Sequence, residues 1–125
     1  MSKKILIVDD SESLRIELKA SLEQSNYSVI EAGSGAEGLK EAKNNHDLCL
    51  IISDYNMLGM DGISMCKKIK EMPEFAKVPI LMLTTESNPK LKELGKEAGI
   101  GAWVVKPFDR DKFKNIEKII SALKQ

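Results

Sequence analysis

Five short runs of apolar residues recur along the chain, and each leads into a longer segment with helical spacing. Four of the five runs are followed directly by a polar residue. Three of these runs lack polar alternation, which is typical of strands buried on both faces of a parallel sheet. The run at residues 27–32 alternates more, as edge strands do. The pattern predicts strands at residues 4–8, 27–32, 48–52, 78–83 and 102–105.

The segments between these runs repeat apolar side chains at every third or fourth position, which predicts amphipathic helices. Asp10 or Ser11 caps the first helix. Ser34 and Glu37 have the form of a capping box, so a second helix runs to about Asn44.

The later helices have similar signals. Gly62 opens the third helix, and Pro73 closes its pattern. The fourth helix carries an apolar face at i, i+3, i+4 and i+7, formed by Leu91, Leu94, Gly95 and Ala98. Gly99 is its predicted stop, and Asp109 caps a fifth helix.

Strand and helix therefore alternate five times over the 125 residues. This alternation predicts an α/β fold, in which a parallel sheet has helices on both faces. The length fits one domain, and we expect a single domain over residues 1–125.

Composition excludes several classes of function. The 19 basic and 19 acidic residues balance, so nothing favours nucleic acid or an anionic membrane as partner. Only four apolar residues follow Lys4 before Asp9, which is too few for a signal peptide or a membrane span. We therefore expect a cytoplasmic protein. We also expect it to be a monomer. Cys49 and Cys66 fit apolar core positions, and with His46 as the single histidine a zinc site is improbable.

Polar residues at the strand ends form the candidate site. Asp9 and Asp10 follow the first strand, Asp54 the third, Thr84 the fourth and Lys106 the fifth. Ligands of open α/β sheets bind outside the carboxyl ends of the strands. If the first and third strands are neighbours, the three carboxylates converge.

Converging carboxylates repel one another, and a bound Mg²⁺ relieves this repulsion while leaving coordination positions for phosphoryl oxygens. Lys106 adds a positive charge and Thr84 a hydroxyl donor, and Asp54 can then attack phosphorus as a nucleophile. Separately, Asp10 as a helix cap, Asp54 as a turn residue and Lys106 in a salt bridge are equally good interpretations. Their coincidence at four strand ends favours a site.

The motifs that carry these residues resemble the receiver domain of two-component response regulators, and most closely the CheY-like chemotaxis type. They are Asp9-Asp10, the segment DYNMLGMDG from Asp54, LTTES from Leu83 and WVVKPF from Trp103. The resemblance covers nearly the whole chain. It implies the flavodoxin-like strand order 2-1-3-4-5, doubly wound with five helices.

The resemblance also implies a role for each residue. Asp54 would be the phosphoacceptor. Asp10, Asp54 and the backbone carbonyl of Asn56 would ligate Mg²⁺, with Asp9 acting mainly through water. Lys106 would contact the phosphoryl group and would be held by a cis Lys106-Pro107 bond. Thr84 and Trp103 would form the switch, and Asn56 and Glu86 would tune hydrolysis.

Three residues depart from the usual family pattern: Leu58 replaces Pro, Trp103 replaces Tyr or Phe, and Thr85 replaces a smaller residue. A loop with Leu58 has less conformational restriction than one with Pro. The bulk of Trp103 opposes an inward rotamer, and Thr85 narrows access for the phosphodonor.

The resemblance implies a signalling protein and not an enzyme beyond its own phosphorylation and dephosphorylation. The donor would be the phosphohistidine of a CheA-like sensor histidine kinase, or a phosphotransfer protein. Because the chain ends at Gln125, we expect the output to be a protein contact, for example with the flagellar motor switch. The surface would be the fourth helix, fifth strand and fifth helix, around Leu91, Trp103 and Phe113.

Other functions remain open at this point. A single-domain phosphorelay intermediate fits the same residues, as does a receiver that binds a partner without phosphorylation. A Mg²⁺-dependent phosphohydrolase with an aspartate nucleophile uses similar groups, although its acids follow a DxD pattern. Residues 33–38 spell GxGxxG, but they follow a predicted edge strand, which disfavours dinucleotide binding.

Overall fold

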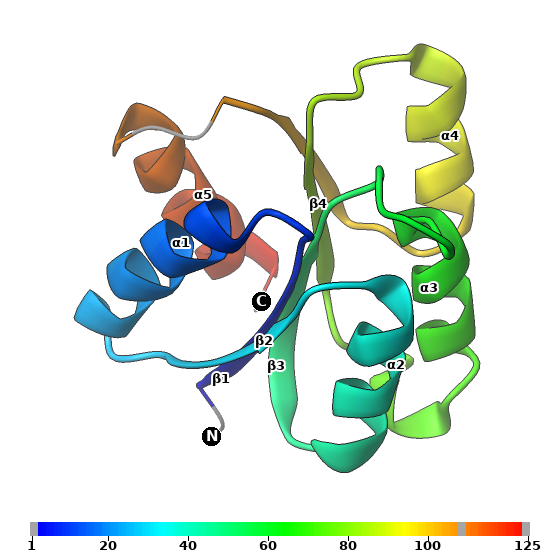
Figure 1. Cartoon of the computed structure of the whole chain (residues 1–125), viewed down its shortest axis with the longest axis horizontal. Coiled ribbons are helices and arrows are strands. Elements are labelled where there is room, and N and C mark those ends of the chain that lie inside the picture. Colours follow the sequence, from blue (N-terminus) through cyan, green and yellow to red (C-terminus); the bar gives the residue numbers. More distant parts are fainter. Residues whose placement is uncertain (1–2, 108–109, 124–125) are drawn as a thin grey trace.

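The computed structural model describes residues 3–107 and 110–123. Its centre is a five-stranded parallel sheet with the order β2-β1-β3-β4-β5 (Figure 1), and the predicted fold class is confirmed. The strands are β1 (Lys4–Val8), β2 (Ser28–Ala32), β3 (Leu48–Ser53), β4 (Ile80–Thr84) and β5 (Ala102–Val105). As predicted, β2 is an edge strand.

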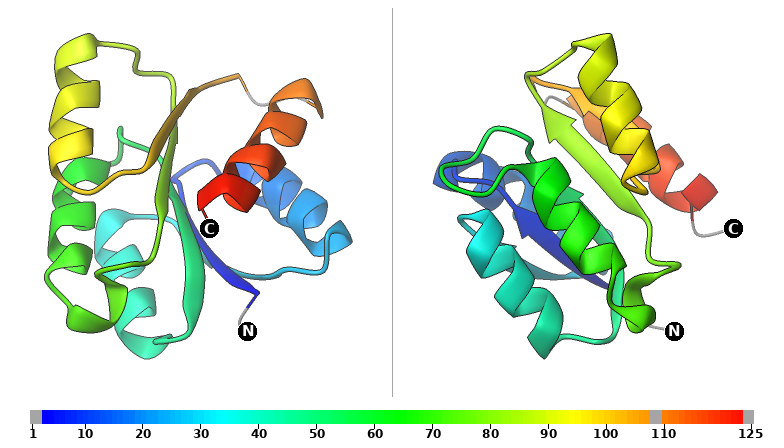
Figure 2. Two further views of the ribbon diagram at one scale, coloured as in Figure 1. Left: turned by 180° about the vertical axis from the view of Figure 1, so that it is seen from behind. Right: turned by 90° about the vertical axis from the view of Figure 1, so that its right-hand side faces the viewer.

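Two layers of helices enclose this sheet. On one face lie α1 (Glu12–Gln24) and α5 (Arg110–Leu123); on the other lie α2 (Gly35–Asn44), α3 (Gly62–Lys70) and α4 (Pro89–Glu97) (Figure 1). The right-hand view of Figure 2 shows the last three side by side across the sheet. A short 3-10 helix, η1 (Pro73–Phe75), links α3 to β4. None of the helices in the described part of the chain is long and apolar enough to cross a membrane.

The sheet divides the core into two clusters because successive strand side chains point to opposite faces. Ile5 and Ile7 of β1 pack with α1 and α5, and Leu6 and Val8 pack with the layer of α2, α3 and α4. All four are essentially inaccessible to solvent. An apolar run without polar alternation is thus what a strand covered on both faces requires.

Side-chain caps fix where the helices begin. Ser11 and not Asp10 caps α1, since its hydroxyl accepts a hydrogen bond from the backbone N–H of Leu14. Ser34 caps α2 in the same way, as predicted. Asp61 caps α3, because its carboxylate accepts from the N–H of Ser64. Asp10 is therefore available to the site beside it.

Several boundaries and one apolar face differ from the sequence prediction. β2 begins at Ser28 and β4 at Ile80, and α3 ends at Lys70, before Pro73, which opens η1. Leu94 is 45% exposed, so its prediction as part of the apolar face of α4 is wrong. A nine-residue helix buries only a narrow stripe, here centred on Gly95 and Ala98. Asp109 lies outside the described residues, as does the side chain of Phe113.

The strand register brings the ends of β1 and β3 together. Val8 pairs with Ser53 in this parallel ladder, and the N–H of Asp54 donates to the carbonyl of Val8. The residues that follow these two strands are Asp9, Asp10 and Asp54. The sheet therefore places both acidic segments at one point on its carboxyl edge.

Candidate functional site

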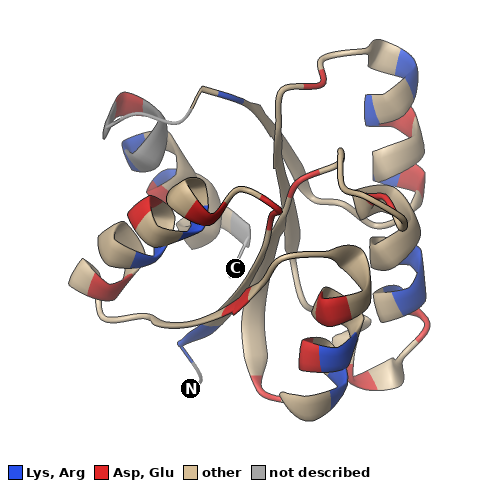
Figure 3. Cartoon of the chain, viewed as in Figure 1, with Lys and Arg blue, Asp and Glu red and all other residues tan. Residues whose placement is uncertain are grey.

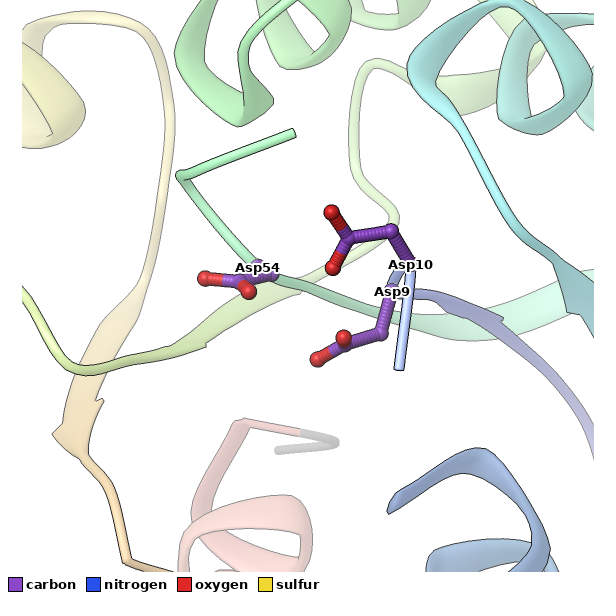
Figure 4. A group of neighbouring side chains, drawn as sticks. All are labelled: Asp9, Asp10 and Asp54. Atoms are coloured by element: carbon purple, nitrogen blue, oxygen red, sulfur yellow. The ribbon is translucent and has the colours of Figure 1, made fainter. Parts of the chain in front are cut away.

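Three carboxylates gather where β1 and β3 end. Asp9, Asp10 and Asp54 each offer an oxygen atom, and these atoms lie within 4.8 Å of one another (Figure 4). Asp9 and Asp54 are buried, whereas Asp10 is exposed. Figure 3 shows this acidic centre at the strand ends, while both charge signs are spread over the helices. The cluster is thus buried at Asp9 and Asp54 and open to solvent at Asp10.

Lys106, which follows β5, supplies the positive charge nearest to the cluster. Its Nζ lies 2.9 Å from Asp9 Oδ2 and 3.1 Å from Asp54 Oδ2. Its N–H donates to the carbonyl of Thr84 at 2.8 Å, and the Lys106-Pro107 peptide bond is cis. One ammonium group therefore bridges two of the three carboxylates.

The pKa values of the bridge reflect both burial and pairing. Burial raises the pKa of the Asp9 carboxyl, and hydrogen bonds from the Ser11 N–H and from Lys106 offset only part of this rise. Burial lowers the pKa of Lys106, but its hydrogen bond to Asp9 and its attraction to Asp9 and Asp54 outweigh that effect and leave the pKa raised. Lys106 is therefore charged at neutral pH.

The loop after β3 holds the Asp54 side chain from its other oxygen. Asp54 Oδ1 accepts hydrogen bonds from the N–H of Tyr55 at 2.7 Å and of Asn56 at 3.3 Å. Gly62 lets this loop close, because a Cβ at that position would collide with the carbonyl oxygen of Asp54. The glycine at the start of α3 is thus required by a close approach of two backbones.

A second set of contacts links the site to α4 and β5. Asn56 Nδ2 donates to Glu86 Oε1 at 3.3 Å, and the Glu86 N–H donates to Thr84 Oγ1 at 3.4 Å. The indole N–H of Trp103 donates to the Glu86 carbonyl at 2.8 Å. Its ring lies against Gly95, where an added Cβ would stand 2.9 Å from Cζ3. Glu86 therefore contacts all three residues: Asn56, Thr84 and Trp103.

The donor set fits a magnesium ion. Carboxylate oxygens are the hard ligands that Mg²⁺ prefers, and a site with few protein ligands leaves room for water and phosphoryl oxygens. Three carboxylates with one bridging lysine leave excess negative charge in the cluster, which a divalent cation neutralises.

The structure also locates the three departures from the usual pattern. Leu58 is 90% exposed on the loop after β3. Thr85 is exposed after β4 and does not contribute to the core. Trp103 is half-buried and is fixed by its N–H, a donor at a ring position that Phe lacks.

Sequence reasoning missed Arg15 of α1. Its Nη1 donates to the backbone carbonyl of Asp9 at 2.6 Å, and its Nε donates to Glu31 Oε1 at 3.2 Å. No pattern in the sequence pointed to this contact, because a basic residue on the polar side of a helix usually faces solvent. The GxGxxG segment, in contrast, is explained by packing, since Cβ atoms at Gly35 and Gly38 would crowd α3 and the loop before it.

Known proteins resemble this chain in sequence and in structure. A family model described as the response regulator receiver domain matches residues 5–118. The chain is 36% identical over 106 residues to the chemotaxis protein CheY1 of Helicobacter pylori, a match that covers 84% of this chain and 86% of that protein. It is 42% identical over 108 residues to the transcriptional regulatory protein PhoP of Bacillus subtilis, covering 86% of this chain but only 44% of that protein.

Solved structures agree with these relatives. The chemotaxis response regulator CheY4 of Vibrio cholerae superposes with a TM-score of 0.87 at 37% identity, covering 95% of this chain and 99% of that chain. A complex of CheX, CheY, BeF3 and Mg from Borrelia burgdorferi superposes with a TM-score of 0.85 at 26% identity, covering 95% and 87%. Together with the family match, these likenesses show that the chain belongs to the receiver domain family of two-component response regulators.

Proposed function

We propose that this chain is a phosphorylation-dependent signalling switch that accepts a phosphoryl group on Asp54. The observation that carries the proposal is the cluster of Asp9, Asp10 and Asp54 within 4.8 Å, bridged by Lys106. Phosphoryl transfer requires mainly positioning and neutralisation of charge, and this cluster supplies both. Residues 1–125 act as one receiver unit, as the family match over residues 5–118 supports.

The chain's own residues divide the chemistry among them. An Asp54 carboxylate oxygen attacks phosphorus, and the phosphorus–nitrogen bond of the donor phosphohistidine breaks with its electron pair passing to the imidazole. Lys106 binds a phosphoryl oxygen with the ammonium that pairs with Asp54 in the unphosphorylated protein. Asp10, Asp54 and the Asn56 carbonyl would hold Mg²⁺, with Asp9 through water; the ion supplies charge neutralisation at the phosphoryl oxygens.

The switch follows from the contacts around Glu86. The Thr84 hydroxyl donates to a phosphoryl oxygen, which draws Thr84 toward Asp54 and disturbs its bond from the Glu86 N–H. Trp103 then changes its position, because its indole N–H is hydrogen-bonded to the Glu86 carbonyl. The surface formed by α4, β5 and α5 then changes its affinity for a partner protein.

We assign this output to chemotaxis, where the partner is a protein such as the flagellar motor switch and the donor is a sensor histidine kinase. The support is the match to chemotaxis proteins over most of their length, 86% for CheY1. Asn56 and Glu86, joined by a hydrogen bond at the mouth of the site, would tune the hydrolysis of the aspartyl phosphate.

The test is intact-mass spectrometry after incubation with acetyl phosphate, with and without Mg²⁺, on the wild-type protein and on Asp54→Asn. One Mg²⁺-dependent phosphoryl adduct, absent from the variant, is the expected result. Release of phosphate at a steady rate without any adduct would instead indicate a phosphohydrolase. No adduct despite bound Mg²⁺ would indicate a binding module that works without phosphorylation.

A further inference from the structure

Arg15 joins three parts of the fold beside the acidic cluster. It is the fourth residue of α1 and reaches the ends of two strands: the Asp9 carbonyl after β1 and the Glu31 carboxylate in β2. Its side chain is only 17% exposed. The bond to the carbonyl, at 2.6 Å, is short for a charged donor. This arginine is therefore fixed in place and does not extend into solvent.

The carbonyl that Arg15 holds is the one that orients Asp10. A peptide group is planar, so the Asp9 carbonyl carbon and oxygen share a plane with the nitrogen and Cα of Asp10. The Asp9 N–H donates to Ala32 and its carboxylate accepts from the Ser11 N–H, which secures Asp9 itself. Among the residues that the structure describes, Arg15 is the one that donates a hydrogen bond to the Asp9 carbonyl, the group that leads to Asp10. Asp10 is the exposed member of the cluster, and burial does not hold its side chain.

The charge of Arg15 works against cation binding. A guanidinium close to the acidic cluster repels a divalent cation, and its ion pair with Glu31 reduces this repulsion without removing it. Glu31 is shared with Lys19, whose Nζ lies 3.5 Å from Oε2. A favourable effect of Arg15 on metal binding would therefore come from geometry, and its electrostatic effect has the opposite sign.

The geometry points to Arg15 as a positioning residue for the metal site: by holding the Asp9 carbonyl, with Glu31 orienting the guanidinium, it fixes the peptide that aims the Asp10 carboxylate at the cluster. This inference rests on the proposed function, because it takes the Mg²⁺ site at Asp10 and Asp54 as given. Groups that orient metal ligands contribute strongly to affinity, and their loss weakens metal binding by roughly 10- to 100-fold.

The experiment measures Mg²⁺ affinity directly, by titration calorimetry on the unphosphorylated protein, for the wild type, Arg15→Met and Lys19→Met. Arg15→Met removes the bond to the carbonyl and one positive charge. Lys19→Met removes one positive charge from the same helix and the same Glu31, but it leaves the Asp9 carbonyl bonded. We expect Arg15→Met to bind Mg²⁺ about tenfold more weakly and Lys19→Met to bind as the wild type or slightly more tightly.

Two further measurements separate positioning from general damage to the fold. Thermal unfolding without Mg²⁺ reports the structural contribution of Arg15. Arg15→Lys, which keeps the charge and one donor, should recover part of the affinity. Equal or tighter Mg²⁺ binding by Arg15→Met would overturn the inference and leave the proposed function standing. A wild-type protein that does not bind Mg²⁺ would overturn both.

Discussion

At the scale of single residues, Asp9 carries a conflict between burial and pairing. It is 2% exposed, and its pKa is raised although Lys106 and the Ser11 N–H both stabilise its charged form. The burial that places Asp9 beside Asp10 and Asp54 thus lowers the free energy of unfolding at neutral pH.

This conflict predicts how stability varies with pH. The folded protein binds the Asp9 proton more tightly than the unfolded chain, where the reference pKa is 3.8. The contribution of Asp9 to the free energy of unfolding therefore falls as the pH rises from about 4 through the raised pKa. Asp9→Asn removes this fall. In metal-free buffer its stability relative to the wild type should increase between pH 4 and pH 7, as urea unfolding at several pH values would measure.

A control with the opposite shift is available in Asp47. Its hydrogen bond with Lys4 lowers the pKa of this exposed carboxyl, so its contribution is lost only as the pH falls through the lowered value, below 3.8. Asp47→Asn should show no trend against the wild type over the range from pH 4 to pH 7. A stability difference for Asp9→Asn that is independent of pH would contradict the argument.

The sequence is informative about residues of this kind only where chemistry and position coincide. Asp54 and Lys106 stand out because an ionised group at the end of a buried strand costs free energy unless a partner or ligand offsets its desolvation. Arg15 could not be found in the same way, because its contact is with a backbone carbonyl, which the sequence pattern does not reveal. The cap of α1 was ambiguous between Asp10 and Ser11, and only the structure assigns it to Ser11.

At the scale of elements, the end of α3 is fixed by one side chain. Lys70 Nζ donates to three backbone carbonyls of the segment that leads into β4: Phe75 at 3.1 Å, Ala76 at 3.2 Å and Val78 at 2.6 Å. These carbonyls precede β4 and are not part of its ladder with β3. Lys70 therefore supplies a donor to the Ala76 and Val78 carbonyls where the sheet does not, and a second donor to the Phe75 carbonyl, which also accepts from the Val78 N–H.

Replacement of this lysine should loosen the connection between α3 and β4. Lys70→Met keeps the apolar part of the side chain and removes the three hydrogen bonds, so we expect a loss of about 2 kcal/mol in the free energy of unfolding. Urea unfolding measures the loss. The matched control is Lys68→Met, since Lys68 is exposed on the same helix. Equal effects of the two substitutions would show that the carbonyl contacts contribute nothing.

The elements themselves followed from the sequence where the apolar runs are uninterrupted, including β5, whose four residues are all only half-buried. β1 and β5 agree with prediction residue for residue, and the edge position of β2 follows from its alternation. The prediction for α4 failed at Leu94, because a stripe read from spacing does not show how little of a short surface helix the core can cover. β4 begins at Ile80, after Pro79, which has no N–H for a ladder.

At the scale of the whole molecule, Cys66 reports opening of the core. It is inaccessible to solvent in the cluster beneath α3, and burial raises the pKa of its thiol from 9.0 to about 12. At pH 8 roughly one folded molecule in ten thousand would carry the reactive thiolate. Alkylation of this thiol therefore requires the protein to unfold.

Labelling kinetics test this expectation. In a Cys49→Ser background, iodoacetamide at pH 8 should leave Cys66 unmodified in native buffer and should modify it in step with the unfolded fraction as urea is added. Mass spectrometry measures the modification, and a fully denatured sample gives the limiting rate. Rapid labelling in native buffer would show that the core beneath α3 opens without global unfolding.

The direction of the first and last elements has a practical consequence. β1 starts at Lys4, at the end of the strands opposite the carboxylates, and α5 runs back toward that same end. There Glu117 accepts a hydrogen bond from Ser25 at the end of α1. A tether built onto either end would lead away from Asp54. The protein can therefore be immobilised on a sensor chip through a terminal affinity tag with the carboxylate cluster facing the flow, so that a partner protein in solution can approach it unhindered.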